Sequence, residues 1–256
     1  MTFEYVDIDE AKRRTGLRMV VVGNIPSPWT EAAKGIFHIK NMDWVAVRLA
    51  YDSDALKEWC PQRNAPVAIY EDERPRSGWA EILLLAERIA QSPSLLPNDA
   101  AQRALAFGLA HEICGEQGLG WTRRLQLIHA GFQKSGGFSE RVSQYLGRKY
   151  GYSAEAGAAS GLRISQLLAM LAARLKSQRK AGSRYYIGDA VTAVDVYSAT
   201  FMAMFRPLPP EHCAMDPVTR AAFETRNAQT DAALDPVLLE HRDMMYAEHL
   251  RLPLSL

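Results

Sequence analysis

Apolar residues in the first ninety positions form short runs separated by an amphipathic stretch. Residues 18–23 and 44–49 are mostly apolar and have the length of buried strands, which is typical of a sheet covered on both faces. Between them, residues 28–40 predict a helix, because Ser27 is a suitable N-cap and Pro28 suits the first helical position. The pattern predicts a right-handed βαβ unit with parallel strands.

A second group of elements follows this unit. We expect a short helix over residues 54–59 and a strand over residues 67–70, where small, β-branched and aromatic residues come in a row. Pro66 cannot donate to a strand ladder, so it must lie at a strand start, and we expect a cis bond to Ala65. A charged turn and a last short strand lead to an amphipathic helix over residues 79–90.

Helical patterns dominate the rest of the chain. Two prolines and no periodicity mark the stretch before Asp99 as a linker. Helices are expected over 100–116, 154–180, 192–206, 218–227 and 237–250, with shorter ones within 115–152. The predicted domains are an α/β domain at 1–91 with a polar lead-in at 1–17, a linker at 92–99 and an all-helical domain at 100–256.

Composition narrows the class of protein. Of 256 residues, 48% are hydrophobic, which favours a sizeable core, and the formal net charge of +1 argues against binding nucleic acid or a membrane surface by bulk charge. No apolar stretch predicts a transmembrane helix, and the acidic N-terminus does not resemble a signal peptide, so we expect a cytoplasmic protein. Cys60, Cys114 and Cys213 lack the spacing of a metal site or disulfide framework and are expected to be structural thiols.

Two stretches resemble the glutathione transferases. The segment from Asn64 to Ser77, with its proline, strand, charged turn and serine at a helix start, resembles their glutathione-binding half. The segment 188–195 resembles their G-D-x-x-T-x-x-D motif, in which Thr192 caps a helix and accepts from the amide of Asp195, while Asp195 reaches back to the amide of Thr192. The resemblance extends over about 18–250. It implies a thioredoxin-like α/β domain followed by an all-α domain, which is the architecture of this family.

The resemblance implies a serine-type catalytic site at Ser27. In such transferases a serine at the start of the first helix donates a hydrogen bond to the glutathione sulfur. The chemistry is reasonable, because a helix N-terminus and a hydroxyl both stabilise a thiolate. The alternative is that Ser27 only caps its helix.

Further glutathione contacts follow from the resemblance. The backbone of Val67 would pair with the cysteinyl part, and Ser77, at a helix N-terminus, would bind the γ-glutamyl carboxylate. Arg63 and Asn64 would meet the glycyl carboxylate, or else remain solvated surface residues. Arg76 departs from the family pattern, which has an acidic or amide residue there, and would repel the ammonium group of the ligand.

The helical domain would supply the second substrate. Trp29, Phe107, His111 and Trp121 are candidates for an apolar pocket between the domains, with burial in the core as the alternative. The predicted function is therefore attack of the glutathione thiolate on a small, mostly apolar electrophile, in a homodimer, with glutathione as co-substrate and without metal or nucleotide. The alternative is a transferase-like fold kept as a binding or regulatory protein; a disulfide reductase would need a cysteine at Ser27.

Overall fold

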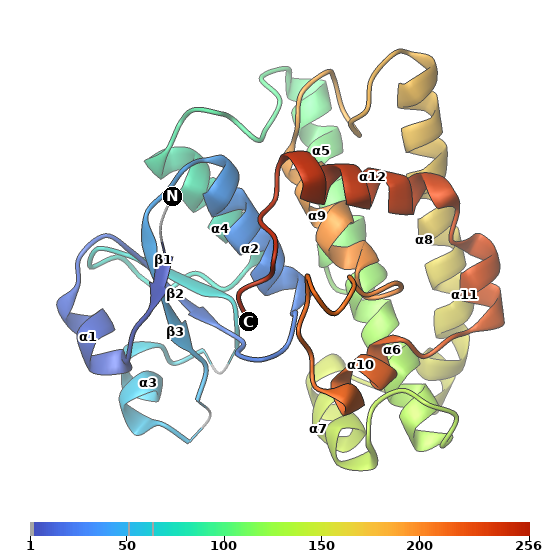
Figure 1. Cartoon of the computed structure of the whole chain (residues 1–256), viewed down its shortest axis with the longest axis horizontal. Helices are drawn as coiled ribbons and strands as arrows, with labels where there is room; N and C mark the ends of the chain where they lie inside the picture. Colours follow the sequence, from blue (N-terminus) through green and yellow to red (C-terminus); the bar gives the residue numbers. More distant parts are fainter. Residues whose placement is uncertain (1–2, 51, 63) are drawn as a thin grey trace.

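The computed structural model describes residues 3–50, 52–62 and 64–256. An α/β half and a helical half lie side by side (Figure 1). The α/β half contains β1 (Phe3–Tyr5), α1 (Ile8–Arg13), β2 (Leu17–Val21), α2 (Pro28–Ile39), β3 (Trp44–Arg48), α3 (Asp54–Trp59), β4 (Val67–Tyr70) and α4 (Trp79–Ile89). The helical half contains α5 (Ala100–Cys114), α6 (Leu119–Phe132), α7 (Glu140–Tyr150), α8 (Ala154–Lys180), α9 (Ala193–Met202), α10 (Pro217–Phe223), α11 (Ala228–Ala233) and α12 (Pro236–Glu248).

The sheet has the strand order β1-β3-β2-β4. β2 and β3 are parallel and are joined by α2, which confirms the predicted βαβ unit. β4 is antiparallel to β2. The last strand expected before α4 is reduced to one bridge, in which Arg76 and Ala68 exchange backbone hydrogen bonds of 2.8 and 2.9 Å.

The polar lead-in adds a strand to the sheet, which the sequence did not predict. β1 pairs in parallel with β3, and the Phe3 ring stacks on Trp44 with centroids 4.3 Å apart. α1 is capped by Asp7, whose side chain accepts from the amide of Glu10 at 2.7 Å, and it buries Ala11 completely. A three-residue strand with a polar centre carries too little periodicity to be recognised from the sequence.

Both faces of the sheet are covered, as expected from its apolar strands. Alternate strand residues point to opposite faces. Met19 and Val21 face α2 and α4 and belong to a core that continues into the helical half. Val20 and Val67 lie in a smaller core beneath α1 and α3. α2 then packs against α9, which joins the two halves of the molecule (Figure 1).

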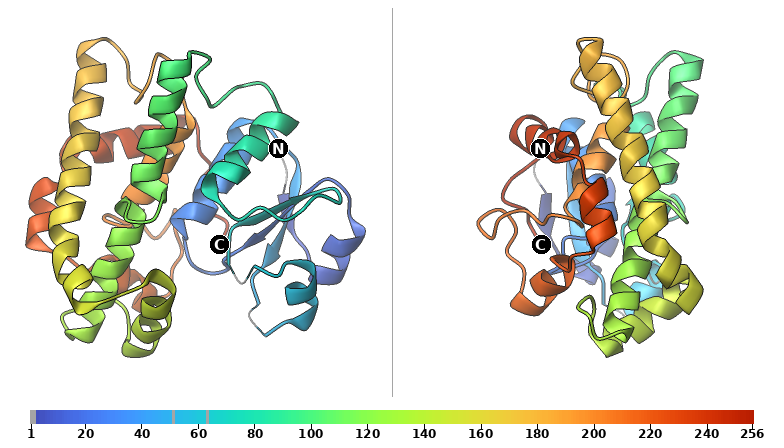
Figure 2. Two further views of the ribbon diagram at one scale, coloured as in Figure 1. Left: turned by 180° about the vertical axis from the view of Figure 1, so that it is seen from behind. Right: turned by 90° about the vertical axis from the view of Figure 1, so that its right-hand side faces the viewer.

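The helical half is built around α8, which runs along its far side (Figure 2). α8 packs against α6, α11 and α12. Within the described part of the chain, α8 is the one helix long and apolar enough to span a membrane, although core helices of soluble proteins meet the same criteria and its inner face is buried. The short helix α11, capped by Asn227, was not predicted.

A buried ion pair anchors the connection between the halves. The ammonium of Lys40 is fully buried and lies 2.8 Å from Glu87 and 2.7 Å from the Pro93 carbonyl oxygen. Glu87 also accepts from the amide of Leu95 at 2.9 Å. The Leu95 carbonyl in turn accepts from Ala193 at the start of α9, so this segment is fixed to both halves.

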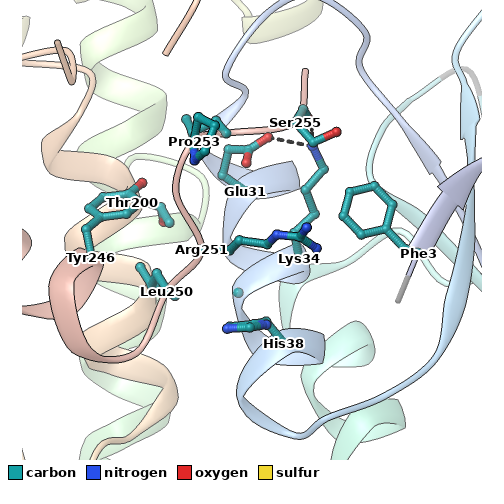
Figure 3. Close-up of a pocket in the computed structure, with 12 residues that line it drawn as sticks. Phe3, Glu31, Lys34, His38, Thr200, Tyr246, Leu250, Arg251, Pro253 and Ser255 are labelled. Atoms are coloured by element: carbon teal, nitrogen blue, oxygen red, sulfur yellow. Dashed lines mark hydrogen bonds and ion pairs between the residues drawn. The ribbon is translucent and has the colours of Figure 1, made fainter. Parts of the chain in front are cut away.

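The C-terminal segment returns from α12 to the α/β half (Figure 1). Its Ser255 carbonyl accepts from Lys34 at 2.6 Å and from the Tyr5 hydroxyl at 3.0 Å. Lys34 also pairs with buried Glu31 at 2.9 Å, and this segment closes a cavity of about 40 Å³ beside the pair (Figure 3). The segment therefore fastens β1 and α2 to the helical half.

The motif at the start of α9 forms a buried network. Asp195 accepts from the Thr192 amide at 2.8 Å, which confirms the predicted reach back. The Thr192 hydroxyl donates to the same carboxylate at 2.7 Å. The other carboxylate oxygen accepts from the Tyr186 amide at 2.9 Å and from His241 Nε2 at 3.0 Å. Asp195 thus joins α9 to α12 and to the turn at Tyr186, which precedes α9.

Candidate functional site

Several element ends meet at one end of the sheet. Because β2 and β4 are antiparallel, the carboxyl end of β2 lies beside the amino end of β4. α2 begins close to the end of β2, after Ser27. The bridge between Ala68 and Arg76 brings Ser77, which precedes α4, to the same end. We call the region around Ser27, Ala65 and Ser77 the helix-start site.

Ser27 is the N-cap of α2, yet its hydroxyl does not cap the helix. Its amide donates to the Ile25 carbonyl and its carbonyl accepts from the Glu31 amide, both at 2.8 Å, so the backbone is held in place. The residue is largely buried, with 8% of its surface exposed. Among the described residues Ser27 therefore occupies the N-cap position without a side-chain hydrogen bond to the helix, and a catalytic role for its hydroxyl stays a prediction.

The Ala65–Pro66 peptide bond is cis, as predicted. Val67 lies opposite Val20 of β2 in the ladder. The amide and the carbonyl of the next residue, Ala68, both bond to Arg76 on the other side of the strand. Because these directions alternate along an antiparallel strand, the backbone groups of Val67 point to β2. Val67 is thus already paired, contrary to expectation.

Ala65 has the unpaired backbone that was expected of Val67. It precedes the strand, and within the described residues neither its amide nor its carbonyl has a backbone partner. An extended peptide can therefore pair with the chain at Ala65 without displacing a strand. The unpaired backbone thus lies two residues before the position at which the sequence pattern placed it.

Arg76 does not present a free positive charge. Its guanidinium donates to Glu73 at 2.6 Å, and Glu73 also binds Arg88 at 2.6 Å. Hydrogen bonds from Arg88 and Arg76 hold the pKa of Glu73 below its ordinary value. The turn before α4 thus contains a carboxylate between two arginines, which offsets the repulsion expected between Arg76 and an ammonium group.

A second acidic side chain lies at the start of α4. Glu81 accepts from the Gly78 amide at 3.3 Å and pairs with Arg74 at 2.8 Å. Hydrogen bonding to Arg74 lowers the pKa of Glu81. Its carboxylate therefore uses one amide of the helix N-terminus at which Ser77 was expected to bind a carboxylate.

Asn64 is contacted from the helical half. The ammonium of Lys149, near the end of α7, donates to Asn64 Oδ1 at 2.8 Å. Arg63, the other residue expected near a glycyl carboxylate, lies outside the described residues. Sequence reasoning missed Lys149, because the two partners are 85 positions apart and no local pattern links them.

Two of the four expected pocket residues share an aromatic cluster. The rings of Trp29 and Trp121 both pack on Tyr150, at 6.4 and 4.7 Å. Trp29 also packs on Phe201 at 4.9 Å and donates to the Cys114 carbonyl at 2.9 Å, so it joins the two halves. A side chain at Gly120 would come within 2.3 Å of Phe201, which explains the glycine.

Phe107 and His111 lie outside this aromatic cluster. The Phe107 ring is 6.2 Å from Trp79, at the beginning of α4. His111 is exposed on α5. The structure therefore brings Trp29 and Trp121 together and leaves the other two candidates apart from them.

The cysteines offer no reactive thiol. Cys60, Cys114 and Cys213 are free and buried. Burial raises the pKa of all three, that of Cys213 to about 11. Since a thiolate is the reactive form, thiol chemistry at the helix-start site would need a thiol from a ligand.

No protein-family model and no curated protein matches this sequence. Solved structures are similar: a glutathione S-transferase from Methylobacterium radiotolerans in complex with glutathione sulfonate is 19% identical over 91% of both chains, with a TM-score of 0.60. A glutathione transferase family member from Pseudomonas fluorescens with two glutathione molecules bound is 11% identical over 94% of both, with a TM-score of 0.64. A Tau class enzyme from mango is 19% identical over 90% of this chain and 98% of its own, with a TM-score of 0.54. The chain therefore has the glutathione S-transferase fold.

Proposed function

We propose that the protein is a member of the glutathione transferase family that binds glutathione and activates its thiol for attack on a small electrophile. The observation that carries this proposal is the Ser27 hydroxyl at the N-terminus of α2, which makes no capping hydrogen bond among the described residues. The structures of similar fold from M. radiotolerans and P. fluorescens contain a glutathione derivative or glutathione, which supports the choice of ligand.

Ser27 would act on the sulfur as a hydrogen-bond donor. One hydrogen bond to a charged group contributes about 1.5–3 kcal/mol, and the positive end of the α2 dipole adds to it. Both favour the thiolate over the thiol. The sulfur then forms a bond to the electrophilic carbon, and the leaving group departs with its electron pair, while Ser27 forms no covalent bond.

The tripeptide would be held at both ends of the helix-start site. The unpaired backbone of Ala65 would pair with the cysteinyl residue, in the role first expected of Val67. The Ser77 hydroxyl would bind the γ-glutamyl carboxylate, and Glu73 would counter the charge of Arg76 near the ammonium. Asn64 would lie at the glycyl end, together with Arg63.

The remaining expectations form part of the same proposal. The α/β domain, residues 1–91, would bind glutathione, and the helical domain, residues 100–256, would supply an apolar surface for the electrophile at Trp29 and Trp121. A cytoplasmic homodimer is proposed, and exposed apolar residues on three helices would contribute to its interface: Leu84, Leu105, Leu162 and Met170. Sedimentation would test the dimer.

One observation favours a binding protein without turnover. The Glu81 carboxylate already accepts from the Gly78 amide, so it competes with a ligand carboxylate for the start of α4. Glu81→Gln removes that charge. A binding protein is supported if this variant binds glutathione more tightly than wild type and both lack turnover.

Calorimetric titration with glutathione and turnover of a chlorodinitrobenzene test the proposal. Ser27→Ala should lower kcat about ten- to a hundredfold while changing affinity much less, because one charged hydrogen bond to the sulfur is lost. Ser53→Ala is the matched control, since the Ser53 hydroxyl caps α3 by accepting from Leu56 at 3.2 Å. Equal losses in both variants, or no turnover by wild type, would contradict an enzymatic role for Ser27.

A further inference from the structure

A polar hollow of about 380 Å³ lies in the helical half, between α6, α8 and the start of α11. Pockets that hold small molecules have volumes of this order. α8 and α11 lie on the side of the helical half that is turned away from the α/β half (Figure 1). We call this cavity the α8 hollow. It contains none of the residues of the helix-start site, so what it binds is independent of the proposed function.

Small residues of α8 leave room for the hollow. Gly157, Ala158 and Gly161 lie close together along the helix and line it. A side chain at Gly157 would come within 2.5 Å of His129 Nδ1, and a side chain at Gly161 would come within 2.6 Å of Gln229 Oε1. The two glycines therefore allow polar side chains from α6 and α11 to lie against the backbone of α8, where they line the hollow.

Among the described residues that line the α8 hollow, none is acidic. The polar part of the lining consists of arginine, histidine, amide and hydroxyl side chains. Asn227 caps α11 through its side-chain oxygen, which accepts from the Thr230 amide at 3.0 Å, so its NH₂ group remains as a donor. Arg226 binds Asp231 through Nε at 2.7 Å, and its terminal nitrogens have no partner in the described part of the chain. The hollow thus presents hydrogen-bond donors rather than carboxylates.

Arg123 supplies a buried positive charge to this lining. The residue is 2% exposed, and no carboxylate pairs with it in the part of the chain that the structure describes. Its guanidinium donates to the Gln126 amide oxygen and to three backbone carbonyl oxygens, which leaves one of its N–H groups unused. Burial lowers the pKa of Arg123 to about 9, so it is still charged at neutral pH. Buried charges are normally paired, and a bound anion would provide the missing partner.

The surroundings of Arg123 are also positive. Asp231 is the carboxylate close enough to favour its charged form, whereas Arg124 and Arg206 disfavour it. Asp231 is in turn shared by Arg206 and Arg226, at 2.9 and 2.7 Å. Four arginines thus lie around one aspartate, and the excess positive charge favours an anion in the α8 hollow.

We propose that the α8 hollow binds the oxyanion of a small polar molecule. Arg123 supplies the buried charge, and the amides of Asn227 and Gln229, at the rim, donate to the same oxyanion. Charge-assisted hydrogen bonds of this kind are the stronger ones in proteins. Phosphate monoesters and carboxylic acids share this chemistry, so the oxyanion has two possible sources.

Three ligands with one carbon skeleton distinguish the sources: glycerol 3-phosphate, glycerate and neutral glycerol. Thermal unfolding of the full chain is followed with each ligand at millimolar concentration, and sodium chloride keeps the ionic strength constant so that screening is equal. A ligand that binds the folded chain raises the unfolding midpoint as its concentration rises. We expect this rise with an anion and not with glycerol. A rise with glycerol 3-phosphate alone assigns a phosphate, and any rise with glycerate assigns a carboxylate.

Gln229→Glu locates the binding site, because it replaces an amide donor at the rim by a carboxylate of the same size. It should weaken binding of the anion about ten- to a hundredfold, which corresponds to the loss of one charge-assisted hydrogen bond. Gln229 is exposed, so the variant keeps the fold. Gln102→Glu is the matched control, since Gln102 is an exposed glutamine of α5 outside the hollow, and this variant should bind as wild type does.

The proposal is overturned if neither anion raises the midpoint above that with glycerol. It is also overturned if Gln229→Glu binds the anion as tightly as wild type, which would place the anion elsewhere, or if Gln102→Glu weakens binding equally, which would indicate an effect of bulk charge. None of these results depends on glutathione, so a failure of this proposal and a failure of the proposed function are distinguishable.

Discussion

Asp195→Asn replaces one of the two acceptor oxygens at the start of α9 by an NH₂ group, without changing the size of the side chain. Each carboxylate oxygen accepts two donors: the amide and hydroxyl of Thr192 on one, the Tyr186 amide and His241 Nε2 on the other. An asparagine offers one oxygen and one NH₂ group. Whichever way it turns, the NH₂ meets a backbone amide that cannot rotate away.

The expected loss follows from this count. Two buried donors lose their acceptor, and each costs about 1–3 kcal/mol, so the free energy of unfolding should fall by about 2–6 kcal/mol. No cavity is created, so the loss reports hydrogen bonding rather than packing. Thr192→Ala is the smaller step, because it removes one hydroxyl and leaves three donors on Asp195, and it should cost about 1 kcal/mol.

Urea denaturation followed by circular dichroism measures both changes. The midpoint should fall for both variants and clearly further for Asp195→Asn. If Asp195→Asn stays within about 1 kcal/mol of wild type, the network of four donors does not stabilise the fold as described.

Two other regions give sharp expectations. Lys34→Met leaves the buried Glu31 carboxylate without its partner and should lower the free energy of unfolding, measured in urea, by about 3–5 kcal/mol. The double variant Glu31→Gln with Lys34→Met should recover most of this loss. An equal loss in the double variant would contradict the pairing. Arg88 and Arg76 hold the pKa of Glu73 below its ordinary value of 4.5. In acid the unfolded chain therefore binds more protons than the folded one. The stability that Glu73 contributes is present above pH 4.5 and is lost as the pH falls below it. Glu73→Gln should therefore flatten the fall of the urea midpoint in acid, and it should weaken glutathione binding by leaving Arg76 unpaired; an unchanged acid profile would refute the arginine contacts.

Local patterns predicted much of the α/β half. The strand at Val67–Tyr70 and the helix at Asp54–Trp59 have the predicted bounds, because apolar runs, a serine cap and proline act within a few residues. The start of α2 after Ser27 follows from the same rules. The expectation of an unpaired backbone at Val67 was wrong, because the alternation of hydrogen-bond directions depends on which neighbour Ala68 binds.

The parts that were missed depend on contacts distant in sequence. β1 forms because it pairs with β3, where the Phe3 ring stacks on Trp44. Its three residues carry no recognisable pattern of their own. Lys149 reaches Asn64 only because α7 is folded back beside the α/β half. Glu73 compensates Arg76 through a turn whose side-chain directions a sequence does not specify.

The ultraviolet difference absorbance of bound glutathione thiolate, measured against pH, tests the central claim most directly. Wild type should show a thiolate at neutral pH, and Ser27→Ala should raise the pKa of the bound thiol by about one to two units, since one unit corresponds to about 1.4 kcal/mol. Ser53→Ala should titrate as wild type, because its hydroxyl caps α3. The absence of thiolate absorbance in wild type at millimolar glutathione, or identical titration curves for wild type and Ser27→Ala, would contradict the account.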